Sequence, residues 1–150
     1  IKQAVQAMTF LNKSARDCMI NYDVHACTDV TGFSMMGHSL EMAQGSDTQI
    51  KIFTDKIDVI EQAYEFAEMG ILPEGMYRNR TYAEPFVNSG DVPLYIQDIL
   101  YDPQTSGGLL ISVSAKDAEK LLSDLQKCTL SANIIGEVEE YKGKERIFLV

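Results

Sequence analysis

Stretches with helical periodicity alternate with short strand-like runs along the whole of this 150-residue chain. From residue 1 to residue 19, apolar side chains recur at three- and four-residue intervals, which predicts an amphipathic helix. Leu109–Val113 is an uninterrupted apolar run of the kind that forms buried strands. Because both kinds of element occur, we expect an α+β fold in α/β/α layers, with helices covering a mixed β-sheet.

The same patterns predict the remaining elements. Helices are expected over residues 33–44, 58–69, 94–100 and 114–125, and strands over 49–53, 133–138 and 146–150, the last two around a turn at 142–144. Residues 25–32 could form a strand or a loop. Asp58 and Glu61 resemble a capping box, and Gly45 and Gly70 are placed to end helices. Residues 71–92 are rich in Pro and Gly and are predicted to be a long loop.

Length and charge restrict the class of protein. The chain fits one domain spanning residues 1–150, and its first residue lies inside a helical pattern without a starting Met, which predicts missing upstream material. The net charge of 13 − 22 = −9 opposes nucleic-acid binding. No apolar run approaches the roughly 18 residues that cross a membrane, and no signal peptide is evident, so we expect a cytoplasmic protein.

The cysteines do not suggest a metal site. Cys18, Cys27 and Cys128 are scattered, odd in number and without a C-x-x-C pair. We therefore expect buried, reduced thiols and neither a disulfide framework nor a zinc site.

Two short segments could carry chemistry. Asp29 lies just before a predicted helix, where a carboxylate either caps the helix or holds a hard cation beside a phosphate; the pattern alone favours a cap or a plain turn. Thr31 and Gly32 follow it. Thr105-Ser106-Gly107-Gly108 forms either a tight turn, which the pattern favours, or a nest of amides that binds an anion. No Lys follows these glycines, so the segment is not a P-loop.

Other polar residues leave their roles open. Arg78-Asn79-Arg80 could clamp a phosphate or carboxylate, or could be a solvated basic spot. His25 and His38 are the only histidines, and packing or hydrogen bonding is favoured over proton transfer because no nucleophile, second base or ligand cluster accompanies them in the sequence.

Four segments together carry a family resemblance. Residues 26–38 read ACTDVTGFSMMGH and resemble the selenophosphate synthetase motif A-x-T-D-V-T-G-F-G-L-L-G-H. Residues 102–110 read DPQTSGGLL and are similar to a second motif of that family. Pro73–Asn79 looks like its P-x-G-x-x-R-N segment, and Ile135–Val138 fits near its end. The chain thus resembles the C-terminal domain of selenophosphate synthetases (selenide, water dikinases), within the aminoimidazole ribonucleotide synthetase-like superfamily.

The resemblance implies a partly ferredoxin-like fold and an N-terminal ATP-binding domain that is absent from this chain. It implies an enzyme, homodimeric when intact, that converts ATP, selenide and water into selenophosphate, AMP and phosphate. Asp29 matches the family's metal-binding Asp, which reverses the preference for a cap and makes it a Mg²⁺ ligand together with carboxylates of the N-terminal domain. Thr31, Gly32 and residues 105–108 then lie near the nucleotide.

Because the family's reactive Cys or Sec belongs to the N-terminal domain, the resemblance assigns no catalytic residue to this chain and predicts that it is inactive alone. Ser34-Met35-Met36 replaces the family's G-L-L, a departure expected to affect packing. The alternatives are the C-terminal domain of another ATP-dependent synthetase of the superfamily, such as a hydrogenase-maturation or thiamine-phosphate kinase relative, and a free-standing non-catalytic interaction module.

Overall fold

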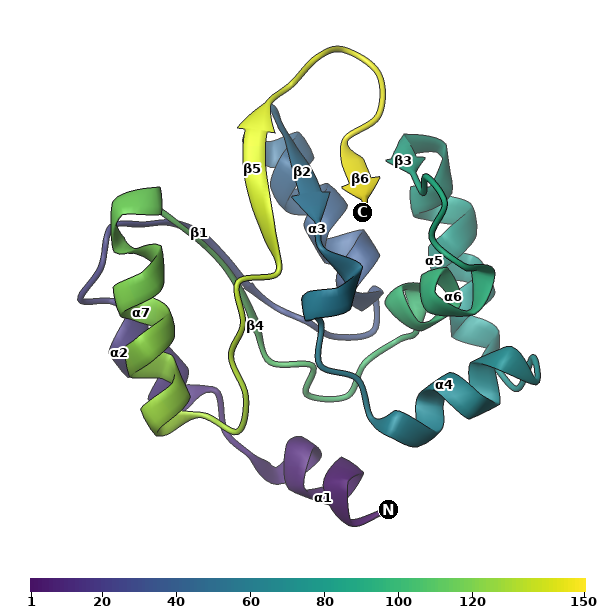
Figure 1. Ribbon diagram of the computed structural model, residues 1–150, viewed down its shortest axis with the longest axis horizontal. Helices are drawn as coiled ribbons and strands as arrows, with labels where there is room; N and C mark the ends of the chain where they lie inside the picture. The colour runs from purple at the N-terminus through teal and green to yellow at the C-terminus, as the bar shows by residue number, and fades with distance from the viewer.

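Seven α-helices and six strands make up the computed structural model, which describes all of residues 1–150 (Figure 1). The helices are α1 (Lys2–Thr9), α2 (Lys13–Met19), α3 (Ser34–Gly45), α4 (Glu61–Glu68), α5 (Glu74–Ala83), α6 (Leu94–Tyr101) and α7 (Ala115–Cys128). The strands are β1 (Val24–Asp29), β2 (Thr48–Ile52), β3 (Val87–Asn88), β4 (Leu109–Val113), β5 (Gly136–Glu140) and β6 (Ile147–Leu149). None of the helices combines the length and the apolar character that a membrane crossing requires.

The strands form two sheets. β1 and β4 make an antiparallel pair, and the other sheet is mixed, in the order β3-β6-β2-β5. The α+β class and a mixed sheet are confirmed, and β1 and β4 form a separate pair, since α3 follows β1 and carries the chain across to β2. The two closing strands, β5 and β6, do not pair with each other; β2 lies between them, antiparallel to β5 and parallel to β6. β4 is half-buried along its whole length and not fully buried as predicted.

The hydrophobic core lies where α3 packs on the four-stranded sheet and α5 and α6 close over it. Figure 1 shows α2 and α7 at one end of the molecule and α4, α5 and α6 at the other. The apolar stripe predicted for α3 is confirmed for Met36, Leu40 and Ala43, which are fully buried, whereas Phe33, also predicted to belong to it, precedes the helix and is 61% exposed. The buried cluster consists of Met36, Leu40, Ala43, Ile52, Met76, Ala83, Leu100, Tyr101, Ile147 and Leu149.

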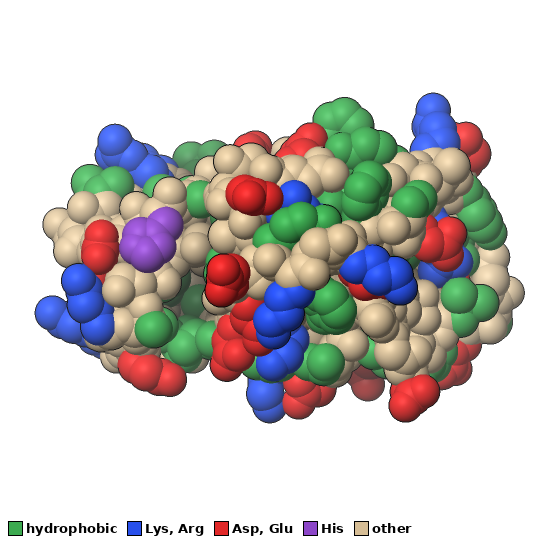
Figure 2. Space-filling view, turned by 90° about the horizontal axis from the view of Figure 1, so that it is seen from above, with side chains coloured by type: hydrophobic (Ala, Val, Ile, Leu, Met, Phe, Trp, Pro, Cys, Tyr) green, Lys and Arg blue, Asp and Glu red, His purple; other side chains and the backbone are tan.

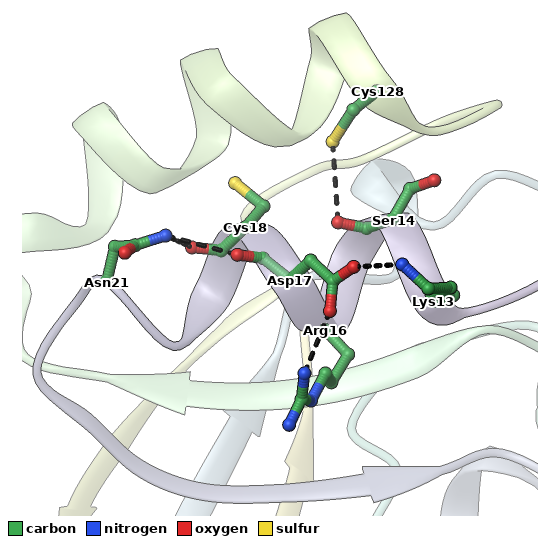
Figure 3. A network of polar contacts seen from close by, with 7 residues as sticks. All are labelled: Lys13, Ser14, Arg16, Asp17, Cys18, Asn21 and Cys128. Carbon is green, nitrogen blue, oxygen red and sulfur yellow. Dashed lines mark hydrogen bonds and ion pairs between the residues drawn. The ribbon is translucent and has the colours of Figure 1, made fainter.

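The predicted helix over residues 1–19 is wrong as a single element, because it breaks between α1 and α2. The break turns α2 so that it packs against α7, while α1 has no buried residue at all. Figure 3 shows this contact: the Cys128 thiol donates to the Ser14 carbonyl at 3.8 Å, and Asp17 pairs with Lys13 at 2.5 Å and with Arg16 at 2.9 Å.

The cysteines are free thiols, as expected, but none is fully buried. Cys18 and Cys128 are half-buried between α2 and α7, and Cys27 is exposed on β1. Burial, reinforced by the neighbouring Cys128 thiol, raises the pKa of Cys18.

The predicted long loop over residues 71–92 is also wrong, because α5 occupies its middle. Gly75 and the polar residues of α5 have modest helix propensity, which explains the expectation of a loop. The helix forms because its buried Met76 and Ala83 pack into the core, and tertiary burial outweighs local propensity. Gly75 itself packs closely against the loop after α6, since a Cβ there would be 3.0 Å from Pro103 Cγ.

The predicted helix ends differ in outcome. Gly70, with φ of 71°, ends α4 as predicted, and the Ile71 amide reaches back to the Phe66 carbonyl at 2.8 Å, as in a Schellman motif. The Asp58–Glu61 capping box is wrong: Asp58 instead accepts from Asn133 at 2.9 Å and from Ser131, and α4 has no side-chain cap. Gly45 is the last residue of α3, and the left-handed residue after that helix is Asp47.

Ser34 stands where the resembling motif has Gly, and its φ of 68° is in the left-handed region. An L-residue pays about 1–2 kcal/mol there, while the hydroxyl recovers part of this cost by accepting the Gly37 amide at 3.3 Å as a cap. We predict that Ser34→Gly raises the free energy of unfolding by about 0.5 kcal/mol, because it removes the strain at the cost of a cap and some chain entropy. Ser34→Ala keeps the strain and loses the cap, so it should lower stability by about 1 kcal/mol in urea unfolding. A Gly variant less stable than the Ala variant would contradict this account.

Candidate functional site

The two long motifs of the sequence meet in space. The turn Asp29–Gly32 leaves β1, the loop Tyr101–Gly108 enters β4, and the antiparallel pairing of these strands sets Asp29 opposite Leu109. The Val30 amide donates to the Gly108 carbonyl at 2.9 Å, and the Val30 carbonyl accepts the Gly107 amide at 3.0 Å. These two segments, residues 29–32 and 101–108, are called the loop pair below.

Asn79 of α5 ties the loop pair together from beneath. It is buried, and its amide nitrogen lies 3.0 Å from the Gly32 carbonyl and 3.0 Å from the Tyr101 carbonyl, so one side chain bridges both segments. From the sequence, Asn79 is considered only as part of the basic segment Arg78-Asn79-Arg80, so this bridging role is not predicted. The only signal was its position in the third resembling segment.

We predict that Asn79→Ala lowers the free energy of unfolding by about 2 kcal/mol, because it leaves two carbonyls without their donor. The neighbouring Arg78→Ala should change stability by less than about 0.5 kcal/mol, since Arg78 pairs with Glu74 on the surface. Chemical denaturation of both variants measures the difference. Equal effects would show that Asn79 does not brace the loop pair.

Asp29 is exposed at the end of β1, and its carboxylate makes no ion pair or side-chain hydrogen bond. It does not cap α3, because that helix begins at Ser34 and its first turn is capped by the Ser34 hydroxyl. The capping alternative is therefore wrong. What is left is a free, solvent-facing carboxylate, whose hard oxygen atoms suit a hard cation such as Mg²⁺.

The negative charge of Asp29 also acts on Cys27, two residues earlier on β1. Partial burial, and then the charge of Asp29, raise the pKa of the Cys27 thiol. Within the loop pair, burial raises the pKa of Asp102, and the hydrogen bond that its carboxylate accepts from Gln104 at 2.9 Å opposes the rise.

The glycine-rich segment is only partly available to a ligand. Thr105, Ser106 and Gly107 are exposed, but the Gly107 amide is already bonded to Val30, whereas the amides of Thr105, Ser106 and Gly108 have no backbone partner. Gly108 has a φ of 83° and Ser106 a φ of 60°. Any anion contact would use those free amides, and Gly107 serves as a spacer that lets the two segments approach.

His38 has partners that the sequence did not reveal. Its Nε2 lies 3.1 Å from the Thr31 hydroxyl, and its Nδ1 lies 2.9 Å from a carboxylate oxygen of Glu41. The ring is 7% exposed and meets the Phe33 ring edge to face at 5.9 Å. The expected hydrogen-bonding role of His38 is confirmed, and its partners are the Thr31 hydroxyl and the Glu41 carboxylate. The available signal was the helical spacing of His38 and Glu41, three residues apart. His25 lies elsewhere, exposed on β1.

A hollow of about 320 Å³ adjoins these residues, lined by Phe33, Glu41, Arg78, Asn79 and Tyr82. A larger one, of about 470 Å³, lies between α4, α5 and α6. Of the charged residues that line it, Arg80 and Asp98 form an ion pair at 2.8 Å, and the third is the acidic Glu68, so the hollow offers no free positive charge to a phosphate. Arg80 also lies over the Tyr101 ring at 5.1 Å, so it braces α5 against α6 and does not belong to a phosphate clamp.

Apolar and charged side chains share the surface. On the face seen in Figure 2, acidic and basic groups are interspersed and apolar side chains emerge between them. Large apolar residues near the chain start are among the exposed ones: Leu11 is 74% and Met8 is 46% exposed.

Comparison with known proteins shows the family to which this chain is related. Residues 2–148 match the family described as AIR synthase related protein, C-terminal domain. A protein named selenide, water dikinase from Clostridium botulinum (strain Eklund 17B / Type B) is 45% identical over 150 residues, which cover 99% of this chain and 43% of that protein. The selenide, water dikinase of Clostridioides difficile (strain 630) is 46% identical over 138 residues, covering 91% and 40% of the two chains. Selenide, water dikinase 2 of Peptoclostridium acidaminophilum is 41% identical over 148 residues, covering 98% and 43%.

Proposed function

The chain belongs to the AIR synthase related C-terminal domain family, and on that premise we propose that it is the C-terminal domain of a selenide, water dikinase. The proposed reaction consumes ATP, selenide and water and yields selenophosphate, AMP and phosphate. The observation that carries the proposal is the loop pair, which brings two segments that resemble selenophosphate synthetase motifs into one hydrogen-bonded unit with a free carboxylate, Asp29, beside it. Because the reaction uses ATP, we place the enzyme in the cytoplasm.

We propose an N-terminal ATP-binding domain as the partner of this chain. The chain spans less than half the length of the relatives it matches, 43% in the case of the Clostridium botulinum protein. The apolar residues of α1, such as Val5 and Met8, are about half exposed, and no residue of this helix is buried. An apolar helix face of this kind suits burial against a further domain. We extend the proposal to a homodimer of the intact enzyme.

The proposed division of work follows from the groups present. Asp29 contributes one carboxylate to a Mg²⁺ site, and the remaining ligands come from the N-terminal domain and the phosphates of ATP, which matches the one or two carboxylates that usually hold this ion. When bound, Mg²⁺ supplies neutralisation of phosphate charge. The chain itself supplies the free amides of Thr105 and Ser106 as hydrogen-bond donors for the phosphates, and Thr31 presents its hydroxyl oxygen on the side where Asp29 lies. Gly32 leaves room for a ligand to approach its backbone closely, since it has no side chain and no other atom of the chain lies within 4 Å of the place that a Cβ would take.

Phosphorus NMR tests the proposal. We expect a protein that joins this chain to its N-terminal domain to form selenophosphate and AMP from ATP and selenide under anaerobic conditions with Mg²⁺. The 150-residue chain alone should fold and turn over no ATP, because it holds one carboxylate of the cation site. Ordinary ATP turnover by the isolated chain, or a longer protein that forms no selenophosphate, would refute the assignment.

A further inference from the structure

Three side chains form a continuous hydrogen-bonded line in which the buried His38 ring joins two exposed residues, Thr31 and Glu41. It starts at the exposed Thr31 hydroxyl, passes through the buried His38 ring, and ends at the Glu41 carboxylate, with contacts of 3.1 and 2.9 Å. Asp29 and Thr31 are exposed and Val30 between them is buried, so the chain alternates here as a strand does. The side chains of Asp29 and Thr31 therefore leave the backbone on the same side.

The backbone of Thr31 is already held before its side chain is considered. Its carbonyl accepts the Ser34 amide at 2.9 Å and the Gln104 amide at 3.1 Å. What remains free is rotation about χ1, which decides where the hydroxyl points. The contact with His38 removes that freedom. His38 lies on α3 between buried residues of that helix. The position of the Thr31 hydroxyl is therefore fixed by contact with a side chain of a rigid element.

Glu41 decides how the His38 ring presents itself. A carboxylate oxygen accepts, so Nδ1 carries the hydrogen that faces Glu41, and the bare Nε2 of that tautomer accepts the hydrogen of the Thr31 hydroxyl. The same arrangement, in which a carboxylate orients an imidazole that orients a working group, recurs wherever a ring must be fixed. Packing alone would bury the His38 ring without a hydrogen bond from Thr31. The second partner of the ring is nevertheless a hydroxyl of the loop pair.

We propose that His38 is a positioning residue: held by Glu41, it accepts the Thr31 hydroxyl hydrogen and so turns the lone pairs of that oxygen toward the side on which Asp29 lies, where they face the proposed cation. The inference rests on the proposed function for its ligand, but the Thr31–His38–Glu41 line exists independently of that function. Its consequence is that Thr31 and His38 act as one unit, so that removing either has the effect of removing both.

Two amide replacements of His38 separate the ends of the line. The amide of Asn reaches about where Nδ1 lies, so His38→Asn keeps a partner for Glu41 and loses Thr31; the longer His38→Gln keeps a partner for Thr31. In the protein with its N-terminal domain, we expect His38→Asn and Thr31→Val each to lower kcat for AMP formation about 10- to 100-fold, with a smaller change in KM. His38→Gln should retain most of the rate, and Thr31→Val/His38→Asn should be no slower than the slower single variant. Equal losses in the Asn and Gln variants, or multiplicative losses in the double variant, would overturn the proposal.

A spectroscopic readout on the 150-residue chain does not depend on activity. The chain has two histidines, so His25→Asn leaves the His38 ring as the only imidazole signal, and this background variant should keep full activity in the longer protein. We expect Thr31→Val to move the Nε2 nitrogen resonance and Glu41→Gln to move the Nδ1 resonance. An Nε2 resonance unchanged by Thr31→Val would refute the line itself. Because Thr31 is exposed, this variant remains informative even if a His38 variant fails to fold.

The two proposals fail in different ways. If Thr31→Val and Glu41→Gln leave the His38 nitrogen resonances unchanged while Asp29 variants still lose activity, the positioning role is refuted and the proposed function stands. Intact nitrogen shifts together with an absence of selenophosphate formation would refute the function and leave the hydrogen-bonded line as a structural feature.

Discussion

Asp29→Asn, made in the protein that includes the N-terminal domain, is expected to lower AMP formation about a thousandfold, which corresponds to about 4 kcal/mol of transition-state stabilisation. The variant keeps the shape of the side chain and removes its charge. Because Asp29 has no ion-pair or side-chain hydrogen-bond partner within the chain, the substitution breaks no such contact, and the expected loss comes from the proposed cation site. Higher Mg²⁺ concentrations should restore part of the rate, since a weakened site fills by mass action.

The fold should not feel this change. Asp29 is exposed and unpaired, so Asp29→Asn should alter the free energy of unfolding of the chain by less than about 0.5 kcal/mol. Asp91 is a matched control, since it too is exposed and makes no ion pair, and Asp91→Asn should leave both activity and Mg²⁺ dependence unchanged. The Mg²⁺ titration of AMP formation is the deciding measurement. An unchanged Mg²⁺ dependence in Asp29→Asn would remove Asp29 from the cation site.

Gly107→Ala is expected to have the second large effect, a loss of about 3 kcal/mol in the free energy of unfolding. A Cβ at this position would lie 2.9 Å from both the carbonyl oxygen and Cγ1 of Val30, and 3.0 Å from Cβ of Gln104. The strain is steric, since φ of Gly107 is not among the left-handed values. The carbonyl cannot yield without breaking its own bond to the Gly107 amide, so the two segments of the loop pair must separate.

Gly32→Ala in the same loop pair is the control for stability. No atom lies within 4 Å of the Cβ that would be added there, and its φ is not positive, so stability should change by less than about 0.5 kcal/mol. Thermal and urea unfolding of the two variants measure the contrast. If Gly107→Ala is as stable as Gly32→Ala, the close approach of the two segments does not hold the site together.

Local patterns identified much of the fold because local physics produced it. The apolar stripes of α3 and α7 and the turn-rich loop before β4 follow from side-chain periodicity and turn chemistry, which act over a few residues. α5 and the break between α1 and α2 depended on contacts with distant parts of the chain, such as the packing of α2 on α7. Propensity over a short window contains no information about such contacts.

The candidate site shows the same division. The resembling motifs singled out Asp29 and the glycine-rich segment, and no rule of spacing could tell whether Asp29 caps a helix. The structure decided this, because α3 begins five residues later and carries its own cap on Ser34. Asn79 and the partners of His38 were found only from coordinates, since each acts through a contact that closes in three dimensions.

The α+β class, the family and the residue types at the site can be predicted from the printed residues, because they depend on composition, periodicity and the order of residues in motifs. Folding was needed to show that residues 29–32 and 101–108 lie together, that Asn79 joins them, and that His38 links Thr31 to Glu41. Hydrogen bonds and steric contacts reach only a few ångströms. They select residues that folding brings together, however far apart these lie along the chain.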